Sequence, residues 1–272
     1  MRDERTTVRS SAAQFRRLAL ILVAITSPFA AAPAGAEEAS TSNYRSLGYD
    51  ISWPQCGESY PVTPMGHAVV GVNGGRAFTR NLCLRSQWRW ARAAMEEPAV
   101  YINLNMPGVP AVPSTSGPAG FCESHNPYCR AHNFGYAAAR HAVAYARSQG
   151  VASSTYWLDV ETMNAWSEDT VENAQVIQGA LNYLEQQGFR VGVYSTPYQW
   201  TVIAGGYSPG LPVWTAGAVD FADARSRCHA DYAFGGGAVV MVQWVDGFDR
   251  NWVCTPPEPR GFERLRPPTG NR

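Results

Sequence analysis

Apolar runs alternate with amphipathic stretches along most of this chain. The apolar runs are rich in Val, Ile, Tyr and Trp, and several have apolar residues at consecutive positions, which is typical of parallel strands buried on both faces. These runs predict strands over residues 48–53, 68–73, 99–105, 155–161, 190–195, 212–217 and 239–245.

The stretches between these runs predict helices over residues 84–97, 130–149 and 169–187. Gly150 and Gly188 follow two of them, where a left-handed residue commonly ends a helix, and Ser167 is placed to cap the third helix. Strands and helices in this order predict parallel strands with right-handed crossovers. We therefore expect an α/β fold, a TIM-like (β/α) barrel with some helices short or missing. A doubly wound open sheet is the alternative, but no G-x-G-x-x-G motif follows a first strand.

The N-terminal segment has the pattern of an export signal. Five arginines precede an apolar run over residues 18–32, and Ala34-Gly35-Ala36 supplies the small-x-small pattern that signal peptidase accepts. We expect a signal peptide at 1–36, one barrel domain at 37–255 and a Pro/Arg-rich tail at 256–272. The protein is then secreted to an extracytoplasmic compartment, and no later run is long and apolar enough to span a membrane.

Removal of the signal segment changes the charge balance. The full chain has 22 basic and 22 acidic residues, and loss of five arginines and two acids leaves 17 against 20. A mildly acidic domain argues against nucleic acid as a partner. Every basic residue is Arg, which excludes a phosphate-binding P-loop lysine and Schiff-base chemistry. We expect a monomer that needs no cofactor.

Six cysteines follow the expected cleavage point, and an even number in an exported chain favours disulfides. Cys122 and Cys129 bracket a short polar loop and are expected to pair with each other. We further expect Cys56 to pair with Cys83, and Cys228 with Cys254. A zinc site that uses the neighbouring histidines is the alternative, but the chain has no C-x2-C pair, so no metal is expected.

Two carboxylates close the run over residues 155–161. Side chains alternate along a strand, so Asp159 and Glu161 share a face with Trp157, and their Cα atoms lie about 6.6 Å apart. Burial beside an indole and repulsion between like charges both raise a carboxyl pKa, so one of the two is expected to keep its proton to a higher pH. Glycosidases use such an asymmetric pair. Acids at strand ends also cap turns, so the pair alone does not decide the function.

Other acids occur where a parallel barrel would place its reactive groups, at the C-terminal ends of strands. Asp50 lies in the first predicted strand, and Asp246 and Asp249 follow the last. Each also has a structural explanation, since Asp246 precedes Gly247 in a common turn sequence and Asp249 could pair with Arg250. These acids form one pocket only if the strands close into a barrel.

Six short motifs, in their order along residues 46–253, resemble the GH25 muramidases, which are lysozymes that cut the glycan strand of peptidoglycan, and related domains of exported actinobacterial proteins. The motifs are Gly48-Tyr49-Asp50-Ile51-Ser52-Trp53-Pro54-Gln55, Asp159-Val160-Glu161, Gly192-Val193-Tyr194-Ser195, Trp214-Thr215-Ala216, Gln243-Trp244 and Asp249-Arg250-Asn251. The resemblance implies a secreted glycoside hydrolase that acts on cell-wall peptidoglycan or a related polysaccharide.

The resemblance also implies roles for single residues. Glu161 would be the general acid, and Asp159 its partner, which orients the substrate or stabilises an oxocarbenium-like centre. Indole faces stack well on sugars, so tryptophans Trp53 and Trp244 are further candidates for the pocket. The substrate-binding set that we expect is Asp50, Asp249, Trp157, Tyr194, Trp214, Gln243 and Asn105.

Two segments depart from the pattern of the family. Residues 71–75 read Gly-Val-Asn-Gly-Gly where K-A-T-E-G is usual, and the third strand has Asn103 and Asn105 where a His is common. Such changes would remodel the sugar subsites, so the main alternative is a catalytically inactive barrel that binds cell-wall polysaccharide. A metal-dependent phosphodiester hydrolase with the same acids around Ca²⁺ or Mg²⁺ is a weaker alternative.

Overall fold

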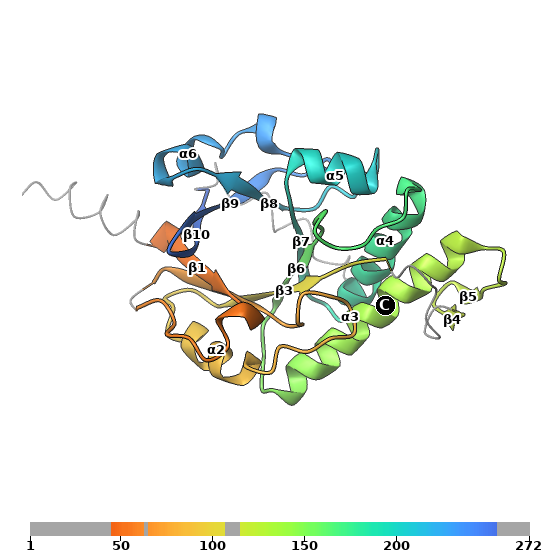
Figure 1. The fold of residues 1–272 in the computed structure, drawn as a ribbon, viewed down its shortest axis with the longest axis horizontal. Coiled ribbons are helices and arrows are strands. Elements are labelled where there is room, and N and C mark those ends of the chain that lie inside the picture. Colours follow the sequence, from red (N-terminus) through yellow and green to blue (C-terminus); the bar gives the residue numbers. More distant parts are fainter. Residues whose placement is uncertain (1–44, 63–64, 107–114, 255–272) are drawn as a thin grey trace, which may run out of the picture.

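The computed structural model describes residues 45–62, 65–106 and 115–254 (Figure 1). The expected signal peptide at 1–36 and the expected tail at 256–272 lie outside the described residues.

Eight strands close into a barrel in the order β1-β10-β9-β8-β7-β6-β3-β2 (Figure 1). Their bounds are β1 Leu47–Ile51, β2 His67–Gly71, β3 Ala99–Asn103, β6 Thr155–Asp159, β7 Arg190–Ser195, β8 Val213–Ala218, β9 Val239–Asp246 and β10 Phe248–Val253. The predicted irregular α/β barrel is therefore confirmed. All seven predicted strands are present, with ends displaced by at most two residues.

The eighth strand, β10, was not predicted. The expectation of an all-parallel sheet is wrong for this strand. Gly247 adopts a left-handed φ of 71° and reverses the chain directly after β9. As a result β10 runs antiparallel to both β9 and β1, whereas the other six strand pairs are parallel. Asp249, expected in a loop after the last strand, lies within β10.

Helices cover the outside of the barrel unevenly. Their bounds are α2 Leu84–Ala91, α3 Pro127–Ser148, α4 Thr170–Gln186, α5 Pro197–Ala204 and α6 Phe221–Ser226. The predicted helix at 84–97 ends six residues early, and α5 and α6 are short helices that the pattern did not reveal. None of the helices in the described ranges combines the length and apolarity needed to cross a bilayer.

Helices α3 and α4 lie against each other on one side of the barrel (Figure 1). Two glycines allow this close approach: a Cβ on Gly135 would lie 1.9 Å from the Val176 carbonyl oxygen, and one on Gly179 would lie 2.0 Å from that of His132. The N-cap of α4 is Asp169, whose carboxylate accepts hydrogen bonds from two backbone N–H groups of the first turn, so the expected cap at Ser167 is wrong.

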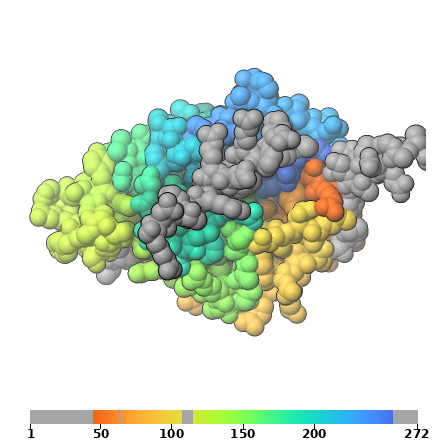
Figure 2. Space-filling model, turned by 180° about the vertical axis from the view of Figure 1, so that it is seen from behind, coloured from red at the N-terminus to blue at the C-terminus, as the bar shows by residue number. Residues whose placement is uncertain are grey.

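Three disulfides join the expected pairs: Cys56–Cys83, Cys122–Cys129 and Cys228–Cys254. The Cys122–Cys129 bond ties a small hairpin, β4 Ser116–Gly117 and β5 Gly120–Phe121, to the first turn of α3. Figure 2 shows this yellow-green part of the chain projecting at one end of the molecule.

The barrel interior is filled by aromatic side chains below a polar rim. Trp214 is at its centre, with ring centroids 5.6 Å from Trp157, 4.5 Å from Tyr194 and 6.3 Å from Tyr101. A second, larger core lies between the strands and helices α2 to α5. Because little solvent reaches the barrel interior, charges at its rim are weakly screened and change the pKa values of neighbouring groups.

Candidate active site

Polar side chains line the mouth of the barrel where the parallel strands end. Trp157 points into the interior, so Asp159, two residues later on β6, points the same way and lies nearer the mouth. Asn103 on β3 is the cross-strand neighbour of Asp159, and Asp249 on β10 is the cross-strand neighbour of Asp50 on β1. Cross-strand neighbours share a face, so these side chains converge from four strands.

Asp50 is the centre of a buried hydrogen-bond network. Its Oδ2 accepts from Gln243 Nε2 at 3.0 Å and from Asn251 Nδ2 at 2.7 Å. Tyr194 Oη in turn donates to Gln243 Oε1 at 2.8 Å. Burial, followed by the nearby charge of Asp249, raises the pKa of Asp50 to about 7, although both amide hydrogen bonds oppose that shift.

Asp159 is held from the opposite side of the mouth. Its Oδ2 accepts from Asn103 Nδ2, and its Oδ1 has no hydrogen-bond donor among the described residues. Asn103 is itself fixed by Asn73, which donates to the Asn103 carbonyl at 2.9 Å and accepts from its backbone N–H at 3.1 Å. The residues in which this chain departs from the usual GH25 pattern therefore position one of the two candidate acids.

Asp159 and Glu161 act on each other as an acid pair. Asp159 is only 4% exposed, and burial together with repulsion from Glu161 raises its pKa well above the usual range. Burial also raises the pKa of Glu161, while a hydrogen bond from Asp159 opposes that rise. The pair therefore keeps a proton at pH values where an isolated carboxyl has lost it.

Glu161 follows the end of β6 and is half-buried at the mouth. Its loop is anchored at two points: Trp166 Nε1 donates to the Glu161 carbonyl at 2.8 Å, and Gln199 Oε1 accepts from the backbone N–H of Thr162 at 2.7 Å. Asp249 is also half-buried, and its charge raises the pKa of Glu161. Asp50, Asp159, Glu161 and Asp249 thus lie close enough to influence one another electrostatically at one mouth.

The candidate tryptophans fall into three different environments. Trp157 and Trp214 are buried in the barrel interior beneath the acids and present no ring face to solvent. Trp244 points out of the barrel and contacts Phe221 of α6, with ring centroids 5.8 Å apart. Only Trp53 of these four is substantially exposed, at 49%, directly after β1. Burial therefore leaves Trp53 as the accessible aromatic surface among them.

Two other polar residues make structural contacts. Asn105 Oδ1 accepts from the backbone N–H of Ala77 at 2.8 Å and so supports the loop after β2. Asp246 forms an ion pair with Arg250 at 3.2 Å, on the outside of the barrel. Arg250 therefore does not neutralise Asp249, which was the structural role considered for that acid.

Tyr101 was not identified from the sequence, although it lies among the acids. It is a partly buried residue of β3 that packs against the interior aromatic cluster, and its hydroxyl is hydrogen-bonded to the Ser52 side chain. Desolvation together with the charges of Asp50 and Asp159 raises its pKa well above 10. Gly71 leaves room for it, since a Cβ there would lie 2.7 Å from Tyr101 Cζ. Its position two residues before Asn103 on the same strand was the available signal.

Among the residues that the structure describes, no three or more His, Cys, Asp or Glu side chains are grouped so as to hold a metal ion. A pocket lies on the outer wall of the barrel, away from the four acids of the mouth, and is described below.

Comparisons with known proteins agree with the fold and the motifs. The family model described as "Lysozyme-like protein 1" matches residues 125–236. The chain is 34% identical over 109 residues to "Probable GH family 25 lysozyme 4" of Dictyostelium discoideum, a match that covers 35% of this chain and 47% of that protein. It is 33% identical over 108 residues to "Lysozyme-like protein 5" of Caenorhabditis elegans, covering 37% of this chain and 46% of that protein. The chain thus spans about half the length of these two curated relatives.

The solved structure of a muramidase from Acremonium alcalophilum has the same fold. It superimposes with a TM-score of 0.50 at 15% sequence identity, over 80% of this chain and 96% of that chain. An identity this low shows the fold alone, so the relationship to lysozymes rests on the family model and the sequence relatives. The family model and the sequence matches thus make this chain similar to lysozyme-like proteins of GH family 25 over part of its length, and its irregular barrel has the fold of the Acremonium muramidase.

Proposed function

We propose that this chain is a secreted hydrolase of the glycan strand of cell-wall peptidoglycan or a related polysaccharide, with Glu161 as general acid and Asp159 as its partner. The observation that carries the proposal is the Asp159–Glu161 pair, whose pKa values are raised at the mouth of the barrel. The names of the GH25 lysozyme relatives and the three disulfides, which are typical of oxidising compartments, support the substrate class and the export.

Glu161 is the member of the pair that a substrate can reach, because Asp159 is almost fully buried. In the proposed reaction the Glu161 carboxyl proton moves to the glycosidic oxygen, and the C–O bond breaks with its electron pair on that oxygen. Water adds to the anomeric carbon, and its proton returns to the carboxylate pair. The remaining negative charge at the mouth stabilises the oxocarbenium-like centre, since carboxylates act strongly where water is excluded.

The test is release of new reducing ends from purified peptidoglycan. The parent protein is expected to release them, and Glu161→Gln, which keeps the shape but has no acidic proton, is expected to lower the rate at least about 100-fold. Glu185→Gln, an exposed residue in the last turn of α4, which leads to the start of β7, is the matched control and should retain the parent rate. Equal release by parent and Glu161→Gln would refute the proposal.

The second candidate function, a barrel that binds the polysaccharide without turnover, is favoured by one observation. Asn103, where a His is common in the family, donates to Asp159 from an amide, which, unlike an imidazole, cannot take up or release a proton. This candidate predicts that the protein sediments with insoluble peptidoglycan and releases no reducing ends. If reducing ends are released, a rate that is insensitive to EDTA would exclude a metal-dependent hydrolase.

A further inference from the structure

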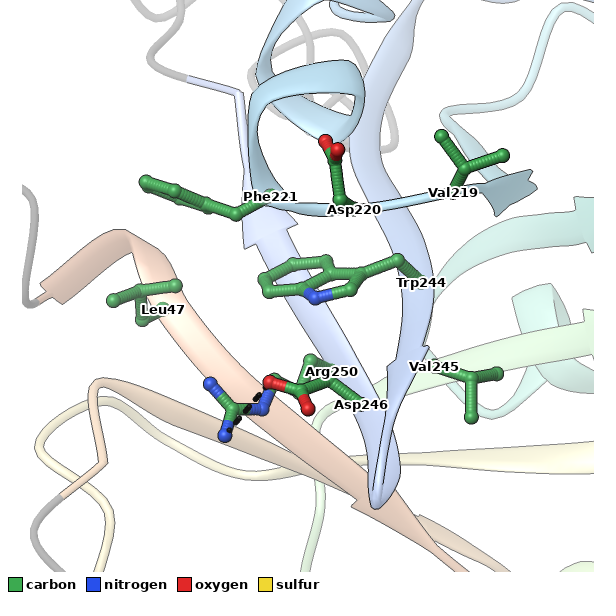
Figure 3. A pocket seen from close by; sticks show the side chains of 8 residues that line it. All are labelled: Leu47, Val219, Asp220, Phe221, Trp244, Val245, Asp246 and Arg250. Carbon is green, nitrogen blue, oxygen red and sulfur yellow. Dashed lines mark ion pairs between the residues drawn. The ribbon is translucent and has the colours of Figure 1, made fainter.

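A pocket of about 460 Å³ lies on the outer wall of the barrel, between the segment after β8 and the β9–β10 hairpin (Figure 3). Its lining combines five apolar side chains with three charged ones: Leu47, Val219, Phe221, Trp244 and Val245, and Asp220, Asp246 and Arg250. Figure 3 shows Trp244 in the middle, with Val219, Asp220 and Phe221 on one side and the Asp246–Arg250 ion pair on the other.

The pocket and the acidic mouth lie on the two faces of the same hairpin. Trp244 and Arg250 are cross-strand neighbours on its outer face. Asp249, one residue nearer the turn than Arg250, points to the opposite face, on which it reaches the mouth. A polymer bound at the mouth can therefore pass over the exposed turn of the β9–β10 hairpin and reach the pocket on the other face.

The walls of the pocket are held in place without a ligand. Asp220 caps α6 by accepting from the Asp223 backbone N–H at 2.8 Å. Phe221 is wedged against Trp244 and Trp252, with centroids 5.8 and 5.5 Å away, and the Arg225 guanidinium lies 5.4 Å from the Trp252 ring centroid. The Cys228–Cys254 disulfide then joins the segment after α6 to the end of β10. A rigid cavity of this kind binds a ligand with little ordering cost.

The lining selects for a neutral ligand that has both apolar and hydroxyl-bearing faces. Two carboxylates against one guanidinium give the lining a net negative charge, which disfavours phosphate-bearing ligands. The charged rim disfavours a purely apolar ligand, because the ion pair would lose solvent without a polar replacement. A pyranose ring meets both requirements: its C–H face can pack on the exposed side chains of Phe221 and Val219, and its hydroxyls can donate to Asp246 and accept from Arg250.

We propose that this pocket is a second saccharide site, which holds a sugar unit of the same polymer whose scissile bond lies at the mouth. This inference rests on the proposed function for its choice of substrate. Its role is to increase the residence of long chains on the protein, since a second contact on one polymer adds avidity without any change at the acids.

The proposal is tested by binding of a tetramer of β-1,4-linked N-acetylglucosamine to the Glu161→Gln protein, in which turnover does not interfere. The readout is the side-chain N–H resonance of Trp244 in protein labelled with ¹⁵N-tryptophan, assigned by its loss in Trp244→Phe. We expect the tetramer to shift this resonance. Val219→Arg, at a side chain 77% exposed on the pocket wall, should weaken the shift-derived affinity about 10-fold or more by filling the cavity.

The matched control is Val202→Arg on α5, where the side chain is 49% exposed and does not line the pocket. It should bind the tetramer as the parent does. Asp246→Ala is a second variant, which removes a proposed hydroxyl acceptor without filling the cavity, and it should also weaken binding of the tetramer. A Trp244 resonance that does not move at saturating tetramer, or equal affinities for Val219→Arg and Val202→Arg, would overturn the proposal; so would a shift caused by a cell-wall stem peptide but not by the tetramer.

This readout separates the two proposals. If no reducing ends appear with the parent protein but the Trp244 resonance shifts, the pocket binds saccharide and the hydrolytic function fails. If hydrolysis occurs and the resonance is unmoved, the function stands and the pocket proposal fails. In active protein, Val219→Arg should raise the KM for insoluble peptidoglycan several-fold with kcat within about twofold of the parent, whereas a folding defect would lower kcat as well.

Discussion

Asp50→Asn tests whether the charge on Asp50 destabilises the folded protein at neutral pH. The side chain is buried, and its Oδ2 accepts two amide hydrogen bonds that an asparagine carbonyl oxygen can also accept. The substitution therefore keeps the shape and the two acceptor contacts and removes only the ionisable group. Its effect on the free energy of unfolding is expected to depend on pH.

The magnitude follows from the pKa of Asp50, which is about 7 in the folded protein against an ordinary value of 3.8. Because the folded-state pKa is raised, the folded protein binds more protons than the unfolded chain between these two values, and stability falls as pH rises through this window. A shift of roughly three units corresponds to about 4 kcal/mol, with no loss below pH 3.8 and the full loss above pH 7.

The measurement is urea unfolding of parent and Asp50→Asn with disulfides intact, at pH values from 4 to 8. The difference in unfolding free energy, variant minus parent, should increase by up to about 4 kcal/mol across this range and level off above pH 7. Asp231→Asn is a suitable control, since Asp231 is exposed. A difference that stays constant from pH 5 to 8 would show that Asp50 is not held at a raised pKa, and the account of the acidic mouth would be wrong.

Three further outcomes are expected. The kcat/KM for reducing-end release should fall as pH rises through the raised pKa of the Asp159–Glu161 pair, because the acid proton is then lost; a profile that falls near the ordinary glutamate value of 4.5 would contradict this. Replacing both Cys228 and Cys254 by Ala should lower the unfolding free energy by about 3 kcal/mol, more than loss of the shorter Cys122–Cys129 loop, as measured by urea titration. Gly71→Ala should destabilise the barrel by roughly 2 kcal/mol, because its Cβ would lie 2.5 Å from Ser52 Cβ; an unchanged melting temperature would contradict that geometry.

The sequence by itself determined the positions of most strands and the face that each presents. Continuous apolar runs identified seven of the eight barrel strands, and the spacing of Asp159 to Trp157 placed both side chains on one face. The local disulfide, Cys122–Cys129, was also predictable, because its loop is short. These features depend on neighbours within a few residues, which is the range over which periodicity and turn chemistry act.

Only the tertiary structure decided which of these residues meet. The mixed polar and apolar sequence of β10 gave no strand signal, yet its pairing with β1 places Asp249 beside Asp50 and Asn251 on the Asp50 carboxylate. The same closure buries Trp157 and Trp214 beneath the acids and leaves Trp244 on the outer wall. Strand periodicity specifies two faces but not which partner lies opposite each of them. The raised pKa values and the outer pocket arise from contacts between strands far apart in the chain, and these exist only once the barrel has closed.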